Sequence, residues 1–296
     1  MKFFLILSLS VFAAVGMPCQ TIAQVNLYKM NTWQDSLIRL GTEMYENKAE
    51  AKRLEKNFIF VKTLVASLKE RHSFLYNFDQ LDMISVVMSP DSRFRIFSWN
   101  IPLHDGSYLY YGAIQSHTED GTLKLVPLLD KTFEINDPEG EALTPSVWYG
   151  AQYYSIVPLT GNRYALLGWK GHAPNYSQKV IEILQCEPNS FVLGGAIFSD
   201  SPTMFRKIFN FARDLSMYLK YDQQKSRIVF DHIVPADPSL QGQYSRYGPD
   251  LSYDAYLLKN GKLILQQDVP FQNEERGNRD DLVQPGQATS GKKSGL

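Results

Sequence analysis

Residues 89–100 read Ser-Pro-Asp-Ser-Arg-Phe-Arg-Ile-Phe-Ser-Trp-Asn, which is a polar turn followed by alternating apolar side chains. The apolar residues 86–88 precede the turn, so the stretch predicts two strands joined by a tight Pro-Asp turn. The same order of strand, polar turn and strand returns at residues 156–170 and again at residues 217–232. These three copies indicate an internal repeat.

The copies align on an arginine that opens the second strand, at Arg93, Arg163 and Arg227. On this alignment the chain has three units of about four strands each. Four-stranded antiparallel units in series are typical of β-propeller blades, although ~4 to 8 blades are needed to close a ring. We therefore expect propeller-like or sandwich-like repeats, and the alternative is a chance resemblance among antiparallel strands.

From residue 82 onward the chain is built of short runs rich in Val, Ile, Tyr and Phe, separated by turn residues. Parallel strands need long crossovers, so these short connections predict a mainly β fold (α+β) with antiparallel sheets. The Asn260-Gly261 pair between two apolar runs predicts a hairpin. Residues 204–211 fit a short helix as well as a strand. The twelve predicted strands are residues 83–88, 93–99, 108–115, 123–129, 149–158, 164–170, 179–184, 191–198, 215–221, 227–232, 253–258 and 262–267.

Residues 25–78 form an N-terminal helical segment that precedes the β domain of residues 79–270. Its apolar residues alternate steps of four and three, which predicts one kinked helix or two helices joined near residues 41–48. The apolar cluster at residues 58–61 widens the apolar face beyond a two-stranded seam, so we expect this segment to pack on the protein's own sheet.

The alternative is a structural subunit that docks on a partner through this helical segment. It predicts that Leu54, Phe58 and Val61 are exposed to solvent.

Composition narrows the class of protein. The chain has 296 residues, of which 44% are hydrophobic and 13% aromatic, so it can bury a sizeable core. Its 30 basic and 31 acidic residues leave a formal charge of -1. Binding to a phosphate backbone needs a basic surface, so no nucleic-acid partner is expected.

Residues 1–24 have the layout of a secretory signal peptide, with one Lys, an apolar run at residues 3–15 and small residues before a cleavage point near Ala23 or Gln24. The run is too short to span a membrane comfortably. We therefore expect a secreted or periplasmic protein with no transmembrane helix in the mature chain. The alternative is a lipoprotein anchored through Cys19, although Gly-Met-Pro before it is a poor lipobox.

The cysteines and the C-terminal residues allow two further predictions. Cleavage would remove Cys19 and leave Cys186 without an intramolecular disulfide partner, and Cys186 follows an apolar run that favours a small buried side chain over a nucleophile. Residues 271–296 are polar, charged and rich in Gly, which predicts a disordered tail.

Two sets of residues are candidates for a site. The repeat alignment places His104, His172 and His232 near one edge, and three imidazoles with an open position suit a catalytic zinc ion. No short ligand spacing such as H-E-x-x-H accompanies them, so unrelated histidines are the competing interpretation.

The second set lies in a long connection at residues 234–252. Loops of this length often bind ligands. Its candidate ligand-binding residues are Tyr244, Arg246, Tyr247 and Asp250, with the tyrosines for stacking on a sugar ring and the guanidinium for a carboxylate or sulfate. The alternative is that the loop covers a sheet edge.

The sequence lacks a G-x-S-x-G elbow, a phosphate-binding glycine loop and a dinucleotide fingerprint. We therefore expect an exported protein of the cell envelope or extracellular space that binds a ligand or protein partner without catalysis. The alternative is an extracellular hydrolase of carbohydrates or esters, with zinc as its cofactor if the three histidines converge.

Overall fold

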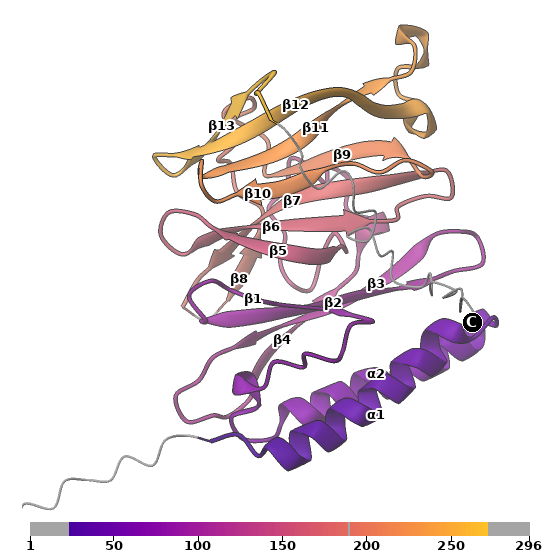
Figure 1. The fold of residues 1–296 in the computed structure, drawn as a ribbon, viewed down its shortest axis with the longest axis vertical. Coiled ribbons are helices and arrows are strands. Elements are labelled where there is room, and N and C mark those ends of the chain that lie inside the picture. The colour runs from indigo at the N-terminus through magenta and orange to yellow at the C-terminus, as the bar shows by residue number, and fades with distance from the viewer. Residues whose placement is uncertain (1–23, 189, 272–296) are drawn as a thin grey trace, which may run out of the picture.

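The computed structural model describes residues 24–188 and 190–271 (Figure 1). The predicted signal peptide with the candidate lipidation residue Cys19, and the predicted disordered tail, lie outside the described residues, apart from Gln24 and Phe271. Within the described residues the chain forms three antiparallel sheets with thirteen strands, and two helices near the N-terminus. The predicted mainly β class with an N-terminal helical segment is confirmed.

The first sheet contains the stretch at residues 89–100. Ser89 holds the turn, because its Oγ accepts hydrogen bonds from the backbone N–H groups of Arg93 at 3.0 Å and Phe94 at 3.1 Å, and Ser92 takes a φ of 56°. The turn therefore fixes the pairing of the first two strands. The sheet consists, in spatial order, of β1 (Ser85–Met88), β2 (Phe94–Pro102), β3 (Tyr108–Ser116) and β4 (Lys124–Leu129).

The second sheet is organised around its longest strand, β7, which pairs with β8 near one end and with β9 along the rest. The segment that fitted either a helix or a strand is strand β9, because Phe209 and Phe211 alternate into the core while the backbone pairs with β7. The strands are β5 (Gln152–Pro158), β6 (Arg163–Lys170), β7 (Tyr176–Cys186), β8 (Phe191–Leu193) and β9 (Arg206–Ala212).

The third sheet corrects one prediction and confirms another. Asn260 and Gly261 have φ values of 52° and 73° and close the predicted hairpin. The prediction of a long connection at residues 234–252 was wrong. Strand pairing continues past a bulge, so only residues 236–246 separate the strand that ends at Pro235 from the strand that begins at Tyr247. The sheet contains β10 (Leu219–Asp222), β11 (Arg227–Pro235), β12 (Tyr247–Lys259) and β13 (Lys262–Gln266).

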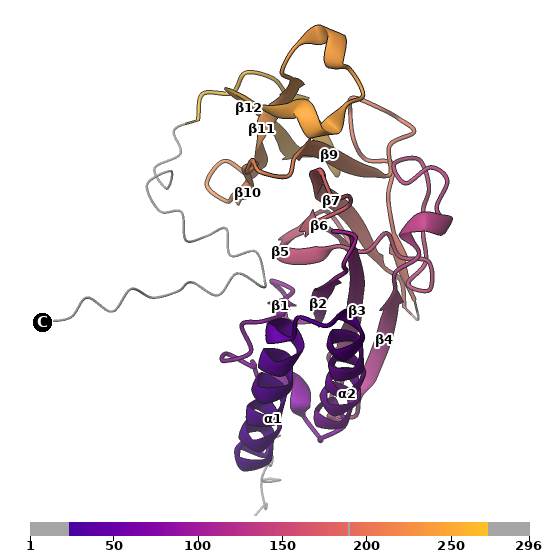
Figure 2. The same ribbon diagram turned by 90° about the vertical axis from the view of Figure 1, so that its right-hand side faces the viewer.

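The three sheets stack face to face in one column, with the helices at one end (Figures 1 and 2). One buried apolar cluster lies between the first and second sheets, and another between the second and third. Each aligned arginine stands at the start of the second strand of its sheet, or directly before it. The repeat is therefore visible in the structure, as three antiparallel sheets that carry the aligned arginine at the same place.

Two of these arginines link neighbouring sheets. Arg93 Nη1 donates to Asn162 Oδ1 of the second sheet at 3.1 Å, and Arg163 Nη2 donates to the Gly261 carbonyl of the third sheet at 3.3 Å. Arg227 instead bonds within its own sheet, from Nε to Asp222 Oδ2 at 3.1 Å. Arg93 and Arg163 therefore connect neighbouring sheets, whereas Arg227 makes its hydrogen bond within its own sheet.

The N-terminal segment forms two antiparallel helices, α1 (Leu27–Glu46) and α2 (Glu50–Leu68), separated near the predicted break. They pack on the face of the first sheet that points away from the second sheet. The apolar face of α2 is displaced by one residue from the predicted one, which is about 100° around the helix axis. Phe60 is buried and Phe58 is 60% exposed, whereas Leu54 and Val61 are partly buried against the cluster between the helices and the first sheet. The break at residues 47–49 resets the helical phase, so the spacing from α1 does not continue into α2.

None of the helices among the described residues is long and apolar enough to cross a membrane.

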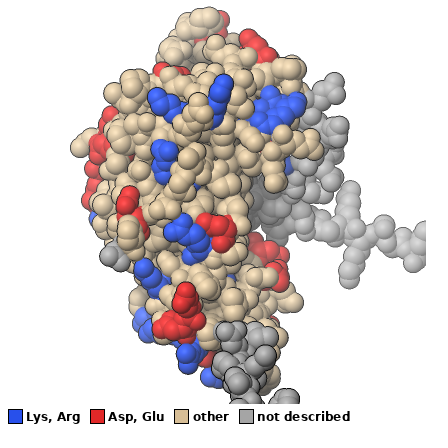
Figure 3. Space-filling model, turned by 90° about the vertical axis from the view of Figure 1, so that its left-hand side faces the viewer, with Lys and Arg blue, Asp and Glu red and all other residues tan. Residues whose placement is uncertain are grey.

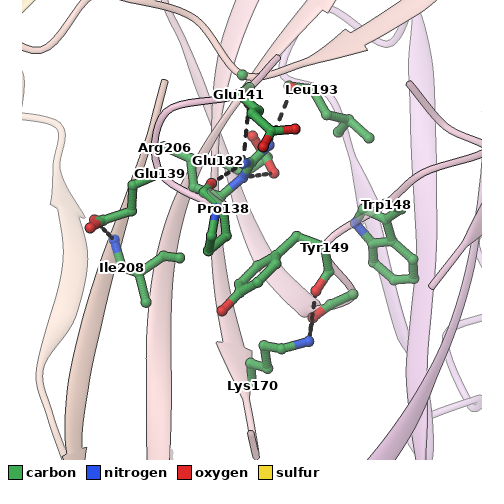
Figure 4. Close-up of polar contacts among 12 residues, drawn as sticks. Pro138, Glu139, Glu141, Trp148, Tyr149, Lys170, Glu182, Leu193, Arg206 and Ile208 are labelled. Carbon is green, nitrogen blue, oxygen red and sulfur yellow. Dashed lines mark hydrogen bonds and ion pairs between the residues drawn. The ribbon is translucent and has the colours of Figure 1, made fainter. Parts of the chain in front are cut away.

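The segment between the first two sheets, residues 130–151, is held against β9 by hydrogen bonds that involve Arg206, whose guanidinium also forms a buried ion pair with Glu182 on β7 (Figure 4). Arg206 Nε lies 2.6 Å from Glu182 Oε2, and both side chains are fully buried. Arg206 also donates to the carbonyls of Pro138 and Glu141, and Glu139 Oε1 accepts from the Ile208 N–H at 2.8 Å. One arginine thus holds the segment against the second sheet.

Candidate ligand-binding edge

The connections between the second and third strands of the three units gather at one edge of the stack. Arg213 joins two of them, because its Nη1 donates to the carbonyls of Gly106 at 2.7 Å and Ala173 at 2.9 Å. Its Nη2 donates to the Tyr108 hydroxyl at 2.7 Å. The third connection reaches this edge through η4 (Tyr244–Arg246), whose Tyr244 ring contacts β7.

Five rings lie in series along this edge, and we call them the aromatic row. Successive ring centroids are 6.5 Å apart from Phe133 to His172, 5.4 Å from His172 to Tyr176, 5.4 Å from Tyr176 to Tyr244 and 5.3 Å from Tyr244 to Tyr247. Phe133 is 82% exposed and Tyr244 is 38% exposed, whereas Tyr247 is buried. The row therefore exposes ring surface at Phe133, in the segment between the first two sheets, and at Tyr244, in the third unit.

His172 supplies a polar group within the row. Burial, with a smaller effect of the Lys170 charge, lowers the pKa of His172 to about 4, although Asp130 opposes the shift. The ring is neutral at pH 7 and carries one donor and one acceptor. Its Nδ1 is buried and has no hydrogen-bond partner within the described part of the chain. This unpartnered nitrogen is shielded from solvent, so it does not face a ligand that lies on the row.

Lys170 supports the row from below. The side chain is buried, and its Nζ donates to Thr132 Oγ1 at 2.8 Å and to the carbonyls of Tyr149 at 2.6 Å and Gly150 at 2.7 Å (Figure 4). Burial lowers the pKa of Lys170 to about 7, and Asp130 opposes this effect. Because all three N–H bonds are used internally, Lys170 positions the connecting segment.

Tyr149 links the support to the Arg206 ion pair. Its ring centroid lies 4.6 Å from Lys170 Nζ and 5.8 Å from Arg206 Cζ, so two cations contact one ring (Figure 4). Its hydroxyl donates to Gln178 Oε1 at 2.9 Å, and Gln178 in turn donates to Asn210 Oδ1 at 2.7 Å. The backbone under the row is therefore held by a continuous polar network.

The structure does not bring the three predicted zinc ligands together. His104 is exposed, with Nδ1 3.9 Å from Glu50 Oε2, whereas His232 Nδ1 lies 2.9 Å from Asp250 Oδ2. Across residues 24–188 and 190–271, no group of three or more His, Cys, Asp or Glu side chains is arranged to hold a metal ion. The connections meet at one edge, but the imidazoles contact different neighbours, so the geometry does not support the zinc hypothesis.

The four predicted ligand-binding residues have different environments. Tyr244 lies in the aromatic row, and the Arg246 side chain is exposed, with no polar partner among the residues that the structure describes. Tyr247 is buried beside them, and its hydroxyl accepts from the Gly242 N–H at 2.8 Å. Asp250 is occupied by His232 and by the N–H and hydroxyl groups of Ser252.

The structure thus links His172 to Tyr244 and Tyr247 through the ring of Tyr176. The sequence analysis had placed His172 in one candidate site and the two tyrosines in the other. Sequence reasoning missed Phe133 and Tyr176, because their neighbours come from other units. The exposed Phe133 in a polar connection was the one local signal.

No protein-family model matches the chain, and a search of curated proteins finds no significant match.

Proposed function

We propose that the protein is an exported, non-catalytic binding protein of the cell envelope or extracellular space, and that its ligand is a carbohydrate chain lying along the aromatic row. The observation that carries the proposal is the series of ring faces from Phe133 to Tyr244. Ring faces provide large, rigid contact surfaces, and aromatic side chains are enriched at recognition sites.

Arg246 gives the proposed site a preference for acidic chains. Its guanidinium is exposed at the Tyr244 end of the row and has no partner in the described residues. A guanidinium pairs with a carboxylate or sulfate through two parallel hydrogen bonds. A chain that carries such groups should therefore bind more tightly than its neutral counterpart.

The proposal assigns no chemical step to the ionisable groups nearby. The ammonium group of Lys170 donates its hydrogen bonds to acceptors inside the protein, and the carboxylate of Asp250 accepts hydrogen bonds from His232 and Ser252. The exposed rings of the row contribute stacking on the sugar units.

Affinity electrophoresis tests the site. The mature chain would be run in native gels that contain dextran, carboxymethyl-dextran, mannan or polygalacturonate. We expect retardation by at least one polysaccharide, and a loss of affinity of about tenfold or more for Tyr244→Ala, since interface tyrosines often contribute over 1.4 kcal/mol. Tyr28→Ala is the matched control, because Tyr28 is 84% exposed and lies on α1.

A comparison within one polysaccharide tests the charge preference. Arg246→Gln should abolish the difference between carboxymethyl-dextran and dextran while leaving the binding of the neutral chain unchanged. Migration unaffected by every polysaccharide, or equal binding by the native chain and Tyr244→Ala, would refute the proposed function.

A further inference from the structure

A second concave surface lies at the opposite end of the same strands, between the first and second sheets. This intersheet groove has a volume of about 760 Å³ and is lined by the β1–β2, β5–β6 and β7–β8 turns together with strands β3 and β4. Ligand sites commonly have ~300 to 1,000 Å³ of space. The groove is separate from the aromatic row, so the inference does not depend on the proposed function.

The floor of the intersheet groove is apolar. Phe94 and Phe191 approach each other across it, with ring centroids 6.1 Å apart, and both belong to the core between the sheets. Val126 packs against this core from β4, and the buried Cys186 adds a thiol whose pKa is raised to about 11, mainly by burial. At neutral pH this floor carries no charge.

The wall formed by the first sheet carries two basic side chains, Lys124 and Arg93, and the carboxylate of Asp91. Phe94, Ser116 and Lys124 are directly opposed on β2, β3 and β4, so their side chains share the face that points toward the second sheet. Lys124 therefore lies over the apolar floor, and its ammonium group has no ion pair or hydrogen bond with the residues that the structure describes. Arg93 reaches across the groove to Asn162, and His117 also lines this wall.

Two carboxylates also line the groove, and one of them pairs with Arg93, because Asp91 Oδ2 lies 4.0 Å from Arg93 Nε. Asp91 Oδ2 accepts from the Tyr164 hydroxyl at 2.6 Å, and Oδ1 lies 3.4 Å from the Arg93 N–H. Burial raises the pKa of Asp91, but hydrogen bonds from Tyr164 and Ser89 outweigh it and hold the pKa below its ordinary value. Glu187 lies on the opposite wall, away from the strand that carries Lys124.

The face drawn in Figure 3 shows basic and acidic side chains interspersed, and the formal net charge of the chain is -1, so no excess of positive charge attracts an anion from a distance. Recognition must then come from local contacts, which are an apolar floor, the ammonium group of Lys124 and the guanidinium of Arg93, whose Nε lies 4.0 Å from Asp91 Oδ2. We propose that the intersheet groove binds an amphipathic monoanion, a free carboxylic acid with an alkyl chain or ring. Its apolar part lies on Phe94, Val126 and Phe191, and its carboxylate lies between Lys124 and Arg93.

Displacement of the fluorescent anion 8-anilinonaphthalene-1-sulfonate from the mature chain tests this assignment. Decanoate, decyltrimethylammonium and decyl maltoside share one chain length and differ in charge. We expect decanoate to displace the probe at concentrations at least about tenfold lower than the cationic amphiphile, which corresponds to about 1.4 kcal/mol. Equal potency of the two ions would overturn the proposal.

Substitutions locate the binding. Lys124→Gln and Arg93→Gln change exposed side chains and should each weaken decanoate binding several-fold, whereas Lys52→Gln on α2 is the control and should have no effect. Val126→Trp fills the groove and should abolish binding, with far-UV circular dichroism to verify folding. Unchanged binding by Lys124→Gln would overturn the proposal even if Val126→Trp failed to fold.

A second arm separates free acids from membrane lipids. Sedimentation with phosphatidylglycerol vesicles should show no binding that depends on Lys124 or Val126. If vesicle binding were lost in these variants, the groove would belong to a membrane lipid, and the assignment to a free acid would be wrong.

Discussion

Replacing Arg206 with Met should be among the most destabilising single changes in this protein. The substitution keeps a long side chain but removes the partner of Glu182, which is fully buried. Glu182 Oε1 already lacks a hydrogen-bond partner in the described structure, so the carboxylate would be left nearly unsolvated. Removal of one partner from a buried ion pair costs about 3 to 5 kcal/mol.

The loss extends beyond the ion pair, because Arg206 also holds the carbonyls of Pro138, Glu141 and Leu193. Urea unfolding would measure the change. With a slope of about 3 kcal/mol per molar urea, a loss of about 4 kcal/mol lowers the midpoint by about 1.3 M. Arg39→Met changes an exposed arginine paired on α1 and should alter stability by less than about 0.5 kcal/mol.

The destabilisation caused by Arg206→Met should depend on pH. Burial already raises the pKa of Glu182 in the native protein, and without Arg206 only a backbone hydrogen bond from Ile183 opposes it among the described residues, so the pKa rises further above the unfolded value of about 4.3. The folded variant then binds more protons than the unfolded chain, so its free energy of unfolding falls as the pH rises above about 4. The deficit relative to the native protein should therefore be smaller at pH 4 than at pH 7.

The double variant Glu182→Leu, Arg206→Met decides whether the buried charge is the cause. Two apolar side chains leave no unpaired ion, so the double variant should be more stable than Arg206→Met alone. A double variant that is as unstable as the single one would refute this reasoning, and so would a loss below about 1 kcal/mol for Arg206→Met.

Three further predictions test other parts of the structure. Lys170 has its pKa lowered to about 7 by burial, so the unfolded chain binds more protons above pH 7, and the native protein should gain stability between about pH 7 and 10 relative to Lys170→Met; parallel denaturation curves across this range would contradict it. Phe60→Ala should cost about 3 to 5 kcal/mol, and Phe58→Ala less than about 0.5 kcal/mol, in thermal or urea unfolding; equal losses would contradict the observed orientation of α2. Mass spectrometry of the exported protein should place its first residue at Gln24 or Val25, and an intact leader would contradict export by this route.

Most strands could be predicted from the sequence, because alternation and turn chemistry are local properties. All twelve predicted strands overlap strands of the structure, including the pair around residues 89–93. The ambiguity of β9 arose because its apolar residues fit both periods, and pairing with β7 decided between them. The buried face of α2 could not be predicted, since it depends on where the break after α1 resets the helical phase.

The candidate site was predictable only in part. Tyr244 and His172 attracted attention separately, through loop composition and through the repeat. Their proximity depends on Tyr176, which lies on a strand of the second sheet between them. The burial of Lys170 is also a property of stacking, because a single lysine at the end of a strand reads as an exposed residue. Sequence patterns indicate which face of a strand a residue occupies. Which residue of another sheet it contacts depends on the order in which the sheets are stacked, and the sequence does not show that order.

The series of aligned arginines that link one unit to the next ends at the third unit. Arg93 and Arg163 each donate a hydrogen bond to the following unit. Arg227 is turned back to Asp222, while residues 268–271 return over the outer side of the last unit through Val269 and Phe271. The outer face of the third unit is therefore covered by the chain itself, and its aligned arginine makes its hydrogen bond to Asp222 of the same sheet.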